Sequence, residues 1–196
     1  MQRLLPMLSM IILLTSCDSN GPCNGESQPT TEGYATLSVA LACFTDTQVD
    51  SVLLVDKAMG RPFARKLAQS NRAYIKKHLP ALLDETINSL IANEYAVALD
   101  PEAFGCPPHV RLISQAEIEE LVTNDPVDSW SNLFELYDGY RGYFWAAEVG
   151  INRSRDQALV YLDYACGLRC GEDAFLLLSK INGVWKCEDK LTMGVS

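Results

Sequence analysis

The chain has 196 residues, with 25 acidic and 16 basic side chains and a formal net charge of −9 at pH 7. This excess of negative charge disfavours nucleic acid as a partner, and it gives the chain as a whole no electrostatic attraction to anionic lipid. The length suits one domain with a sizeable hydrophobic core.

The first seventeen residues combine a basic side chain, a short apolar run and two small residues before a cysteine. Arg3 precedes the apolar run of residues 4–14, and residues 14–17 read Leu-Thr-Ser-Cys. This pattern resembles a bacterial lipoprotein signal peptide. The resemblance implies that residues 1–16 are removed, that Cys17 is acylated, and that the lipid attaches the protein to a membrane of the bacterial cell envelope, facing the periplasm or the exterior. The alternatives are an ordinary secretory signal peptide, cut elsewhere, or a chance match to the pattern.

Six further cysteines predict three disulfides, because an even number in an oxidising compartment normally pairs. They are Cys23, Cys43, Cys106, Cys166, Cys170 and Cys187. The first pair that we expect is Cys166–Cys170, whose short loop would be closed by a hairpin. The Cys-x₃-Cys spacing lacks the usual finger pattern, and neither His78 nor His109 is near it in the sequence. We therefore expect no metal and no other cofactor.

The residues after Cys17 predict a tether followed by helices. Residues 17–33 are rich in Ser, Asn, Gly, Pro and Thr and show no apolar period, which favours a flexible tether. A single α+β domain is expected over residues 34–196. In residues 35–59 the pattern is mixed, and we interpret it as helical with an interruption near Asp46.

Amphipathic patterns predict the next helices. In residues 61–79 apolar side chains recur three or four residues apart, and Pro80 restarts the chain before a second helix with its apolar face from Leu83 to Ile91. The prolines and glycine of residues 101–108 mark a loop. The segment Ser114-Gln115-Ala116-Glu117 has the form of a capping box, in which the first and last side chains each satisfy the other's backbone N–H. It starts a short helix, and another is expected from Asp128.

The last third of the chain changes to the period of β-strands. Residues 142–152, 157–166 and 174–181 read as strands, and Asn182-Gly183 predicts a type I′ hairpin turn that pairs Ile181 with Val184. The predicted fold class is α+β, with N-terminal helices packed on a C-terminal four-stranded antiparallel meander.

Two motifs in this meander resemble a group of uncharacterised bacterial secreted proteins and lipoproteins. They are Cys-Gly-x-x-Cys-Gly at residues 166–171 and Leu-x-Lys-x-x-Gly-x-Trp-Lys at residues 178–186. The hairpin is also similar, less specifically, to the closing strands of cone-shaped nuclear-transport-factor-2-like domains. The resemblance implies a fold and an envelope address, and it adds no catalytic residues. Cys187 stands where an apolar residue is expected, so one disulfide would be particular to this chain.

The candidate site is a pocket on the meander. If the sheet curves into a cone, several polar and aromatic side chains would line a pocket, namely Asp163, Glu148, Tyr161, Trp185, Tyr143 and Trp145. In the alternative, the helices cover one sheet face and the acids point to water. With two histidines, the sequence offers no nucleophile with an adjacent base, so no catalytic set is expected.

Two functions remain open from the sequence. The first is a non-catalytic envelope module that binds an envelope protein or a small ligand. The second is an envelope hydrolase that acts on cell-wall or carbohydrate material, with Asp163 or Glu148 in acid–base chemistry.

Overall fold

The computed structural model describes residues 32–45, 51–56, 62–92, 99–104, 109–123 and 129–196. The expected signal peptide, the acylation site Cys17, and the cysteines Cys23 and Cys106 lie outside the described residues, so the statements about them remain predictions.

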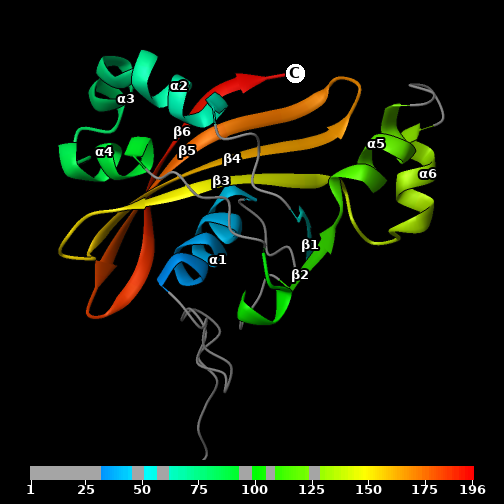
Figure 1. Cartoon of the computed structure of the whole chain (residues 1–196), viewed down its shortest axis with the longest axis horizontal. Coiled ribbons are helices and arrows are strands. Elements are labelled where there is room, and N and C mark those ends of the chain that lie inside the picture. The colour runs from blue at the N-terminus through cyan, green and yellow to red at the C-terminus, as the bar shows by residue number, and fades with distance from the viewer. Residues whose placement is uncertain (1–31, 46–50, 57–61, 93–98, 105–108, 124–128) are drawn as a thin grey trace, which may run out of the picture.

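The described residues form helices and a mixed β-sheet, so the α+β class is confirmed (Figure 1). The helices are α1 (Glu32–Phe44), α2 (Pro62–Ser70), α3 (Arg72–His78), α4 (Asp84–Ala92), the 3-10 helix η1 (Pro101–Phe104), α5 (Gln115–Thr123) and α6 (Ser129–Leu136). The strands are β1 (Ser51–Val55), β2 (His109–Ile113), β3 (Tyr143–Ile151), β4 (Gln157–Gly167), β5 (Cys170–Ile181) and β6 (Val184–Val195).

The sheet has the strand order β2-β1-β3-β4-β5-β6. Strands β3 to β6 pair antiparallel in sequence order, as the meander requires. The prediction of a four-stranded sheet is wrong, because β1 pairs in parallel with both β2 and β3. The run Val52–Val55, interpreted as helical, is an interior strand that is buried on both faces. A short, continuous apolar run fits a buried strand and a buried helix equally well.

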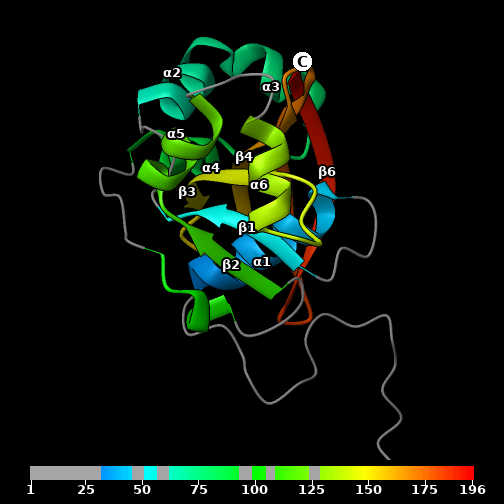
Figure 2. The same ribbon diagram turned by 90° about the vertical axis from the view of Figure 1, so that its right-hand side faces the viewer.

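Helices cover both faces of the sheet (Figures 1 and 2). Leu41 and Phe44 of α1 are buried with Leu176 on one face, which we call the α1 face. On the opposite face, the α2–α6 face, Ile87 of α4 is buried with Leu159. Helices α5 and α6 pack farther along that second face, over β1 and β3.

The β5–β6 turn has the predicted geometry. Asn182 and Gly183 have φ values of 53° and 82°, the positive values that both central residues of a type I′ turn need. Ile181 pairs with Val184, as predicted from the turn.

Helix α1 is attached to the β5–β6 hairpin at both of its ends. At its start, the Glu32 carboxylate is paired with the Lys180 ammonium and accepts a hydrogen bond from the Trp185 indole at 3.1 Å. At its end, Cys43 forms a disulfide with Cys187. Glu32 and its successor were assigned to the tether, and these contacts explain why they belong to the helix. The other described disulfide is the expected Cys166–Cys170.

The capping box before α5 is half formed. The Ser114 hydroxyl accepts a hydrogen bond from the Glu117 backbone N–H at 3.1 Å, as predicted. The Glu117 carboxylate accepts instead from the Tyr137 hydroxyl at 2.5 Å. This contact ties α5 to the residue that follows α6, and burial raises the pKa of Tyr137 to about 12, with the Glu117 carboxylate contributing.

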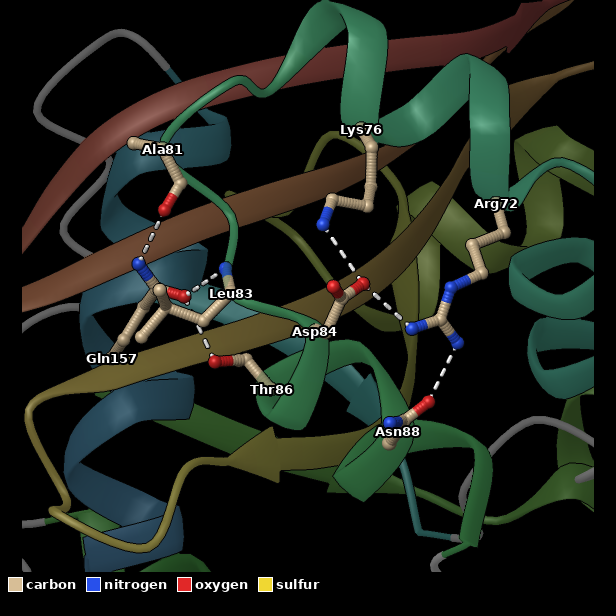
Figure 3. A network of polar contacts seen from close by, with 8 residues as sticks. All are labelled: Arg72, Lys76, Ala81, Leu83, Asp84, Thr86, Asn88 and Gln157. Carbon is tan, nitrogen blue, oxygen red and sulfur yellow. Dashed lines mark hydrogen bonds and ion pairs between the residues drawn. The ribbon is translucent and has the colours of Figure 1, made fainter.

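A buried amide fixes the α3–α4 turn to the start of β4 (Figure 3). The Gln157 carbonyl oxygen accepts hydrogen bonds from the Leu83 backbone N–H and the Thr86 hydroxyl, both at 2.8 Å. The Gln157 amide nitrogen donates to the Ala81 carbonyl at 2.9 Å. The first N–H groups of a helix have no acceptor within the helix. The Gln157 side chain supplies one at the start of α4.

A group of exposed ionic contacts lies beside this buried amide. Asp84 accepts from both Arg72 and Lys76 at 2.8 Å, and Arg72 also donates to Asn88 at 2.6 Å (Figure 3). The Lys76 and Arg72 contacts hold the pKa of Asp84 below its usual value. The two layers of contacts place α3 and α4 on the sheet.

Candidate functional site

A pocket of about 320 Å³ lies at the end of the sheet where β4 and β6 finish and β5 begins. Its floor is a row of directly paired residues: Trp145 pairs with Asp163, Asp163 with Asp173, and Asp173 with Gly194. Paired residues point to the same face of a sheet, so Trp145 and both carboxylates share the α2–α6 face. The other lining residues are Tyr164, Ala165, Gly167, Cys170, Gly171, Glu172, Val195 and Ser196.

The pocket exists because the helical cover of this face is divided. Helices α2–α4 bury Tyr161 and Phe175, the residues next along β4 and β5. Helices α5 and α6 cover Tyr143, next to Trp145 on β3. The two groups of helices stand apart on the face (Figure 1), and the row that contains Asp163 lies between the two buried clusters.

Glycine keeps the floor open beside the carboxylates. A Cβ atom at Gly194 would lie 2.4 Å from the Asp173 Oδ1 atom, and one at Gly171 would lie 2.6 Å from the Ser196 hydroxyl oxygen. Heavy atoms do not approach so closely, so any other residue at position 194 would displace the Asp173 carboxylate.

The two carboxylates differ in their surroundings. Asp173 accepts a hydrogen bond from the Tyr161 hydroxyl at 2.9 Å. Burial raises the pKa of Asp163 to about 6, and the negative charge of Asp173 contributes to the same shift. Tyr161 stays protonated, because burial and then the Asp173 carboxylate raise its pKa. Burial and the neighbouring Asp173 therefore favour the protonated form of Asp163 up to about pH 6.

The neighbouring carboxylate of Glu172 is engaged in a separate contact. It accepts from the Thr192 hydroxyl at 2.7 Å and is paired with the Lys190 ammonium at 2.9 Å. Burial acts to raise the pKa of Glu172, but these two partners hold it below its usual value. Glu172 is thus neutralised within the protein, whereas Asp163 faces a second acid.

The structure brings together part of the predicted pocket. Asp163 and Trp145 line it, and Tyr161 supports it from the buried layer through Asp173. Trp185 is not part of it: this side chain is buried on the α1 face, at the other end of the hairpin. Glu148 lies in β3, but its side chain is outside the described residues.

The sequence reasoning missed Asp173 and Gly194. Both residues lie in a predicted strand or next to one. How closely they approach Asp163, however, depends on the strand register. The one available signal was the Asp at position 173, just before the predicted strand 174–181, since strands of a hairpin extend together.

No protein-family model, curated protein or solved structure matches the chain. Across the described segments, no group of three or more His, Cys, Asp or Glu side chains could hold a metal ion. Among these same residues, no helix is long and apolar enough to cross a membrane. The site is therefore interpreted from its own geometry.

The raised pKa of Asp163 predicts a pH-dependent gain in stability when its charge is removed. The folded pKa of about 6 exceeds the unfolded value of about 4, so wild-type stability falls as the pH rises between these values. The variant Asp163→Asn should unfold at the wild-type denaturant midpoint below pH 4. Above pH 6 we expect it to gain about 1 kcal/mol, less than the full linkage value because solvent still reaches the carboxyl.

Asp156→Asn is the matched control, because hydrogen bonds from Asn152 and Ser154 lower the pKa of Asp156. Its effect should have the opposite sign, a loss of stability at neutral pH. Chemical denaturation of both variants across this pH range measures the difference. Equal stability of Asp163→Asn and wild type at pH 8 would contradict the assigned burial of the charge.

Proposed function

We propose that this protein is a lipid-anchored component of the bacterial cell envelope whose pocket binds a small ligand with a protonated amine. The observation that carries the proposal is the pairing of Asp163 with Asp173 on the floor of an open pocket, beside Trp145. This makes the protein a binding module in the first instance.

Charge and chemistry favour an amine over a neutral or acidic ligand. Asp163 and Asp173 face each other across the β4–β5 pairing, and an ammonium group between them would offset their negative charge while donating to both. A hydrogen bond to a charged group contributes about 1.5–3 kcal/mol. The Trp145 ring beside Asp163 offers a further aromatic contact to a cation, worth about 1 kcal/mol at a partly exposed site.

The envelope address is supported by the disulfides of the domain. Cys43–Cys187 and Cys166–Cys170 are both formed, and structural disulfides persist in oxidising compartments such as the periplasm. This agrees with the lipoprotein-like pattern that ends at Cys17 and with the resemblance of the C-terminal motifs to secreted proteins and lipoproteins. Acylation of Cys17 and the family remain part of the proposal.

Ligand binding tests the proposal directly. Calorimetry with diamines, amino sugars, neutral sugars and carboxylates should show binding by the amine-bearing compounds alone. Asp163→Asn and Asp173→Asn should each weaken that binding at least tenfold, or about 1.4 kcal/mol, because each removes one charge from the ammonium site. The exposed carboxylate variant Asp156→Asn should bind like wild type. Equal binding of neutral sugars, or unchanged binding by both pocket variants, would refute the amine site.

The hydrolase remains a second candidate because the pair offers an acid and a base in one pocket. Asp163, with its raised pKa, could donate a proton while Asp173 accepts one, the division of roles that paired carboxylates use in acid–base catalysis. Turnover of cell-wall material that Asp163→Asn abolishes, with the fold intact, would favour this function over simple binding.

A further inference from the structure

Exposed apolar side chains gather at the end of the sheet opposite the pocket. Ile181 and Val184 flank the β5–β6 turn as a directly paired couple, and they are 46% and 37% exposed. Leu83, at the start of α4, is 45% exposed. We call these three residues and Lys186 the hairpin-end surface.

The strand register places these residues on one face. Gln157 pairs with Ser179, and Ile181 is two residues beyond Ser179, so all three point to the α2–α6 face. The Leu83 backbone N–H binds the Gln157 side chain at 2.8 Å, which puts Leu83 over the same end of β4 (Figure 3). The three apolar side chains therefore share one end of this face.

Basic side chains lie around this surface, although the chain as a whole is acidic. Lys186 pairs with Ser179 and is exposed on the same face. Arg153 and Arg155 are exposed in the β3–β4 turn, which lies alongside because the Lys180 N–H donates to the Asp156 carbonyl at 2.7 Å.

Two acidic neighbours of the surface are held in contacts of their own, whereas Glu85 in the first turn of α4 and Glu188 in β6 are exposed. Asp84, at the start of α4, is paired with Arg72 and Lys76. The Asp156 carboxylate accepts hydrogen bonds from the Asn152 amide and the Ser154 hydroxyl. This end therefore presents three exposed cations, Lys186, Arg153 and Arg155, together with the carboxylates of Glu85 and Glu188.

The N-terminal segment joins the domain at this same end. Glu32, the first residue of α1, contacts Lys180 and Trp185, which flank the hairpin turn on the other face. In Figure 1 the start of α1 and the tip of the β5–β6 hairpin lie close together at the lower left. Cys17 precedes Glu32 by 15 residues, and the tether predicted from the sequence would have a root-mean-square span of about 20 Å over this length.

We propose that the hairpin-end surface docks on the phospholipid bilayer to which the acylated Cys17 holds the protein. The proposal rests on the lipid anchor of the proposed function. A short tether keeps this end of the domain at high effective concentration near the bilayer, so contacts too weak to bind membrane alone become populated. Ile181, Val184 and Leu83 would enter the interface while Lys186 and the two turn arginines meet phosphate groups.

Docking in this orientation would present the pocket to the surrounding solution. Asp163 is six residues along β4 from Gln157, which is about 20 Å at the usual rise per residue. A ligand arriving from the solution would then reach Asp163 and Asp173 without crossing the bilayer surface.

Depth-dependent fluorescence quenching tests the orientation. The full chain, produced with its own N-terminal segment in bacteria, is reconstituted in vesicles of phosphatidylethanolamine and phosphatidylglycerol with brominated acyl chains. A tryptophan placed by Ile181→Trp should lose several-fold more emission than one placed by Leu168→Trp. Leu168 is the matched control, since it is 65% exposed in the loop at the pocket end of the same strands. Emission of the parent chain is subtracted in both cases.

Two results would overturn the proposal, and they are distinguishable. If the protein floats with the vesicles but both introduced tryptophans are quenched equally, the anchor stands and the docking surface is wrong. If the protein does not float with the vesicles, the lipid anchor itself is wrong. A second measurement introduces Ile181→Ser and Val184→Ser together into the Leu83→Trp variant. If the two serines change the mass of the detergent-solubilised protein but do not reduce the quenching of the tryptophan at position 83, the surface contacts protein instead of lipid.

Discussion

Replacing Cys43 and Cys187 together by alanine is expected to lower the free energy of unfolding by about 5 kcal/mol, from the loop-closure entropy of a long cross-link. The disulfide joins residues 144 apart in the sequence. Without the disulfide, the unfolded chain gains conformational entropy, because a loop that spans nearly the whole domain is no longer closed. A loss of this size equals the entire stability of many single domains, so partial unfolding at 37 °C is expected.

The matched control is the second disulfide, because it closes a loop of very different length. Cys166 and Cys170 are 4 residues apart, so replacing both by alanine should cost about 2 kcal/mol by the same relation. Denaturant unfolding of the two double variants, compared with oxidised wild type, measures the difference. Equal losses in the two variants would show that the long cross-link does not act through chain entropy.

The long cross-link is one of several contacts that hold α1 against the β5–β6 hairpin. The contacts of Glu32 with Lys180 and Trp185 hold the start of the helix, while the Lys190 ammonium donates to the Phe44 carbonyl at 3.2 Å near its end. In the variant that lacks Cys43 and Cys187 these contacts remain, so α1 should stay docked in the native state. Near-ultraviolet circular dichroism of the folded variant should therefore resemble that of wild type.

The C-terminal strands were predictable because their signals are local. Alternation along residues 157–166 fixes which side chains share a face, and Asn182-Gly183 fixes the pairing of Ile181 with Val184. The parallel strands carry no such signal. β1 finds its neighbours β2 and β3 across long stretches of chain, so a short apolar run such as Val52–Val55 does not reveal whether it is a strand.

The candidate site was half predictable for the same reason. Alternation placed Asp163 on the face of Tyr161, but the partner of Asp163 depends on the β4–β5 connection. Gly167 pairs with Cys170, and continuing that register without interruption would set Asp163 opposite residue 174. A bulge between Ala165 and Gly167 shifts the pairing by one residue and brings Asp173 opposite Asp163. Neither the bulge nor its effect on the pairing can be predicted from the sequence pattern.

Replacing Gln157 by leucine is expected to lower the free energy of unfolding by about 3 kcal/mol, because one buried and two half-buried polar groups lose their partner and a buried one alone costs about 1–3 kcal/mol. Those groups are the Leu83 N–H, the Thr86 hydroxyl and the Ala81 carbonyl. Leucine fills a similar volume, so the loss reports on hydrogen bonding rather than on a cavity. Denaturant unfolding followed by circular dichroism measures it.

Asp84→Asn is the control for this prediction, since it alters the exposed ionic group on the same pair of helices. Its contacts with Arg72 and Lys76 lie near the surface, and such pairs contribute about 0–1 kcal/mol. Thr86→Val removes one of the donors to Gln157 and so measures the contribution of that donor by itself. If the three form one network, the double variant of Gln157→Leu and Thr86→Val should lose less than the sum of the single losses, because the threonine hydroxyl no longer lacks a partner. Strict additivity, or a Gln157→Leu loss as small as that of Asp84→Asn, would show that the start of α4 does not depend on this amide.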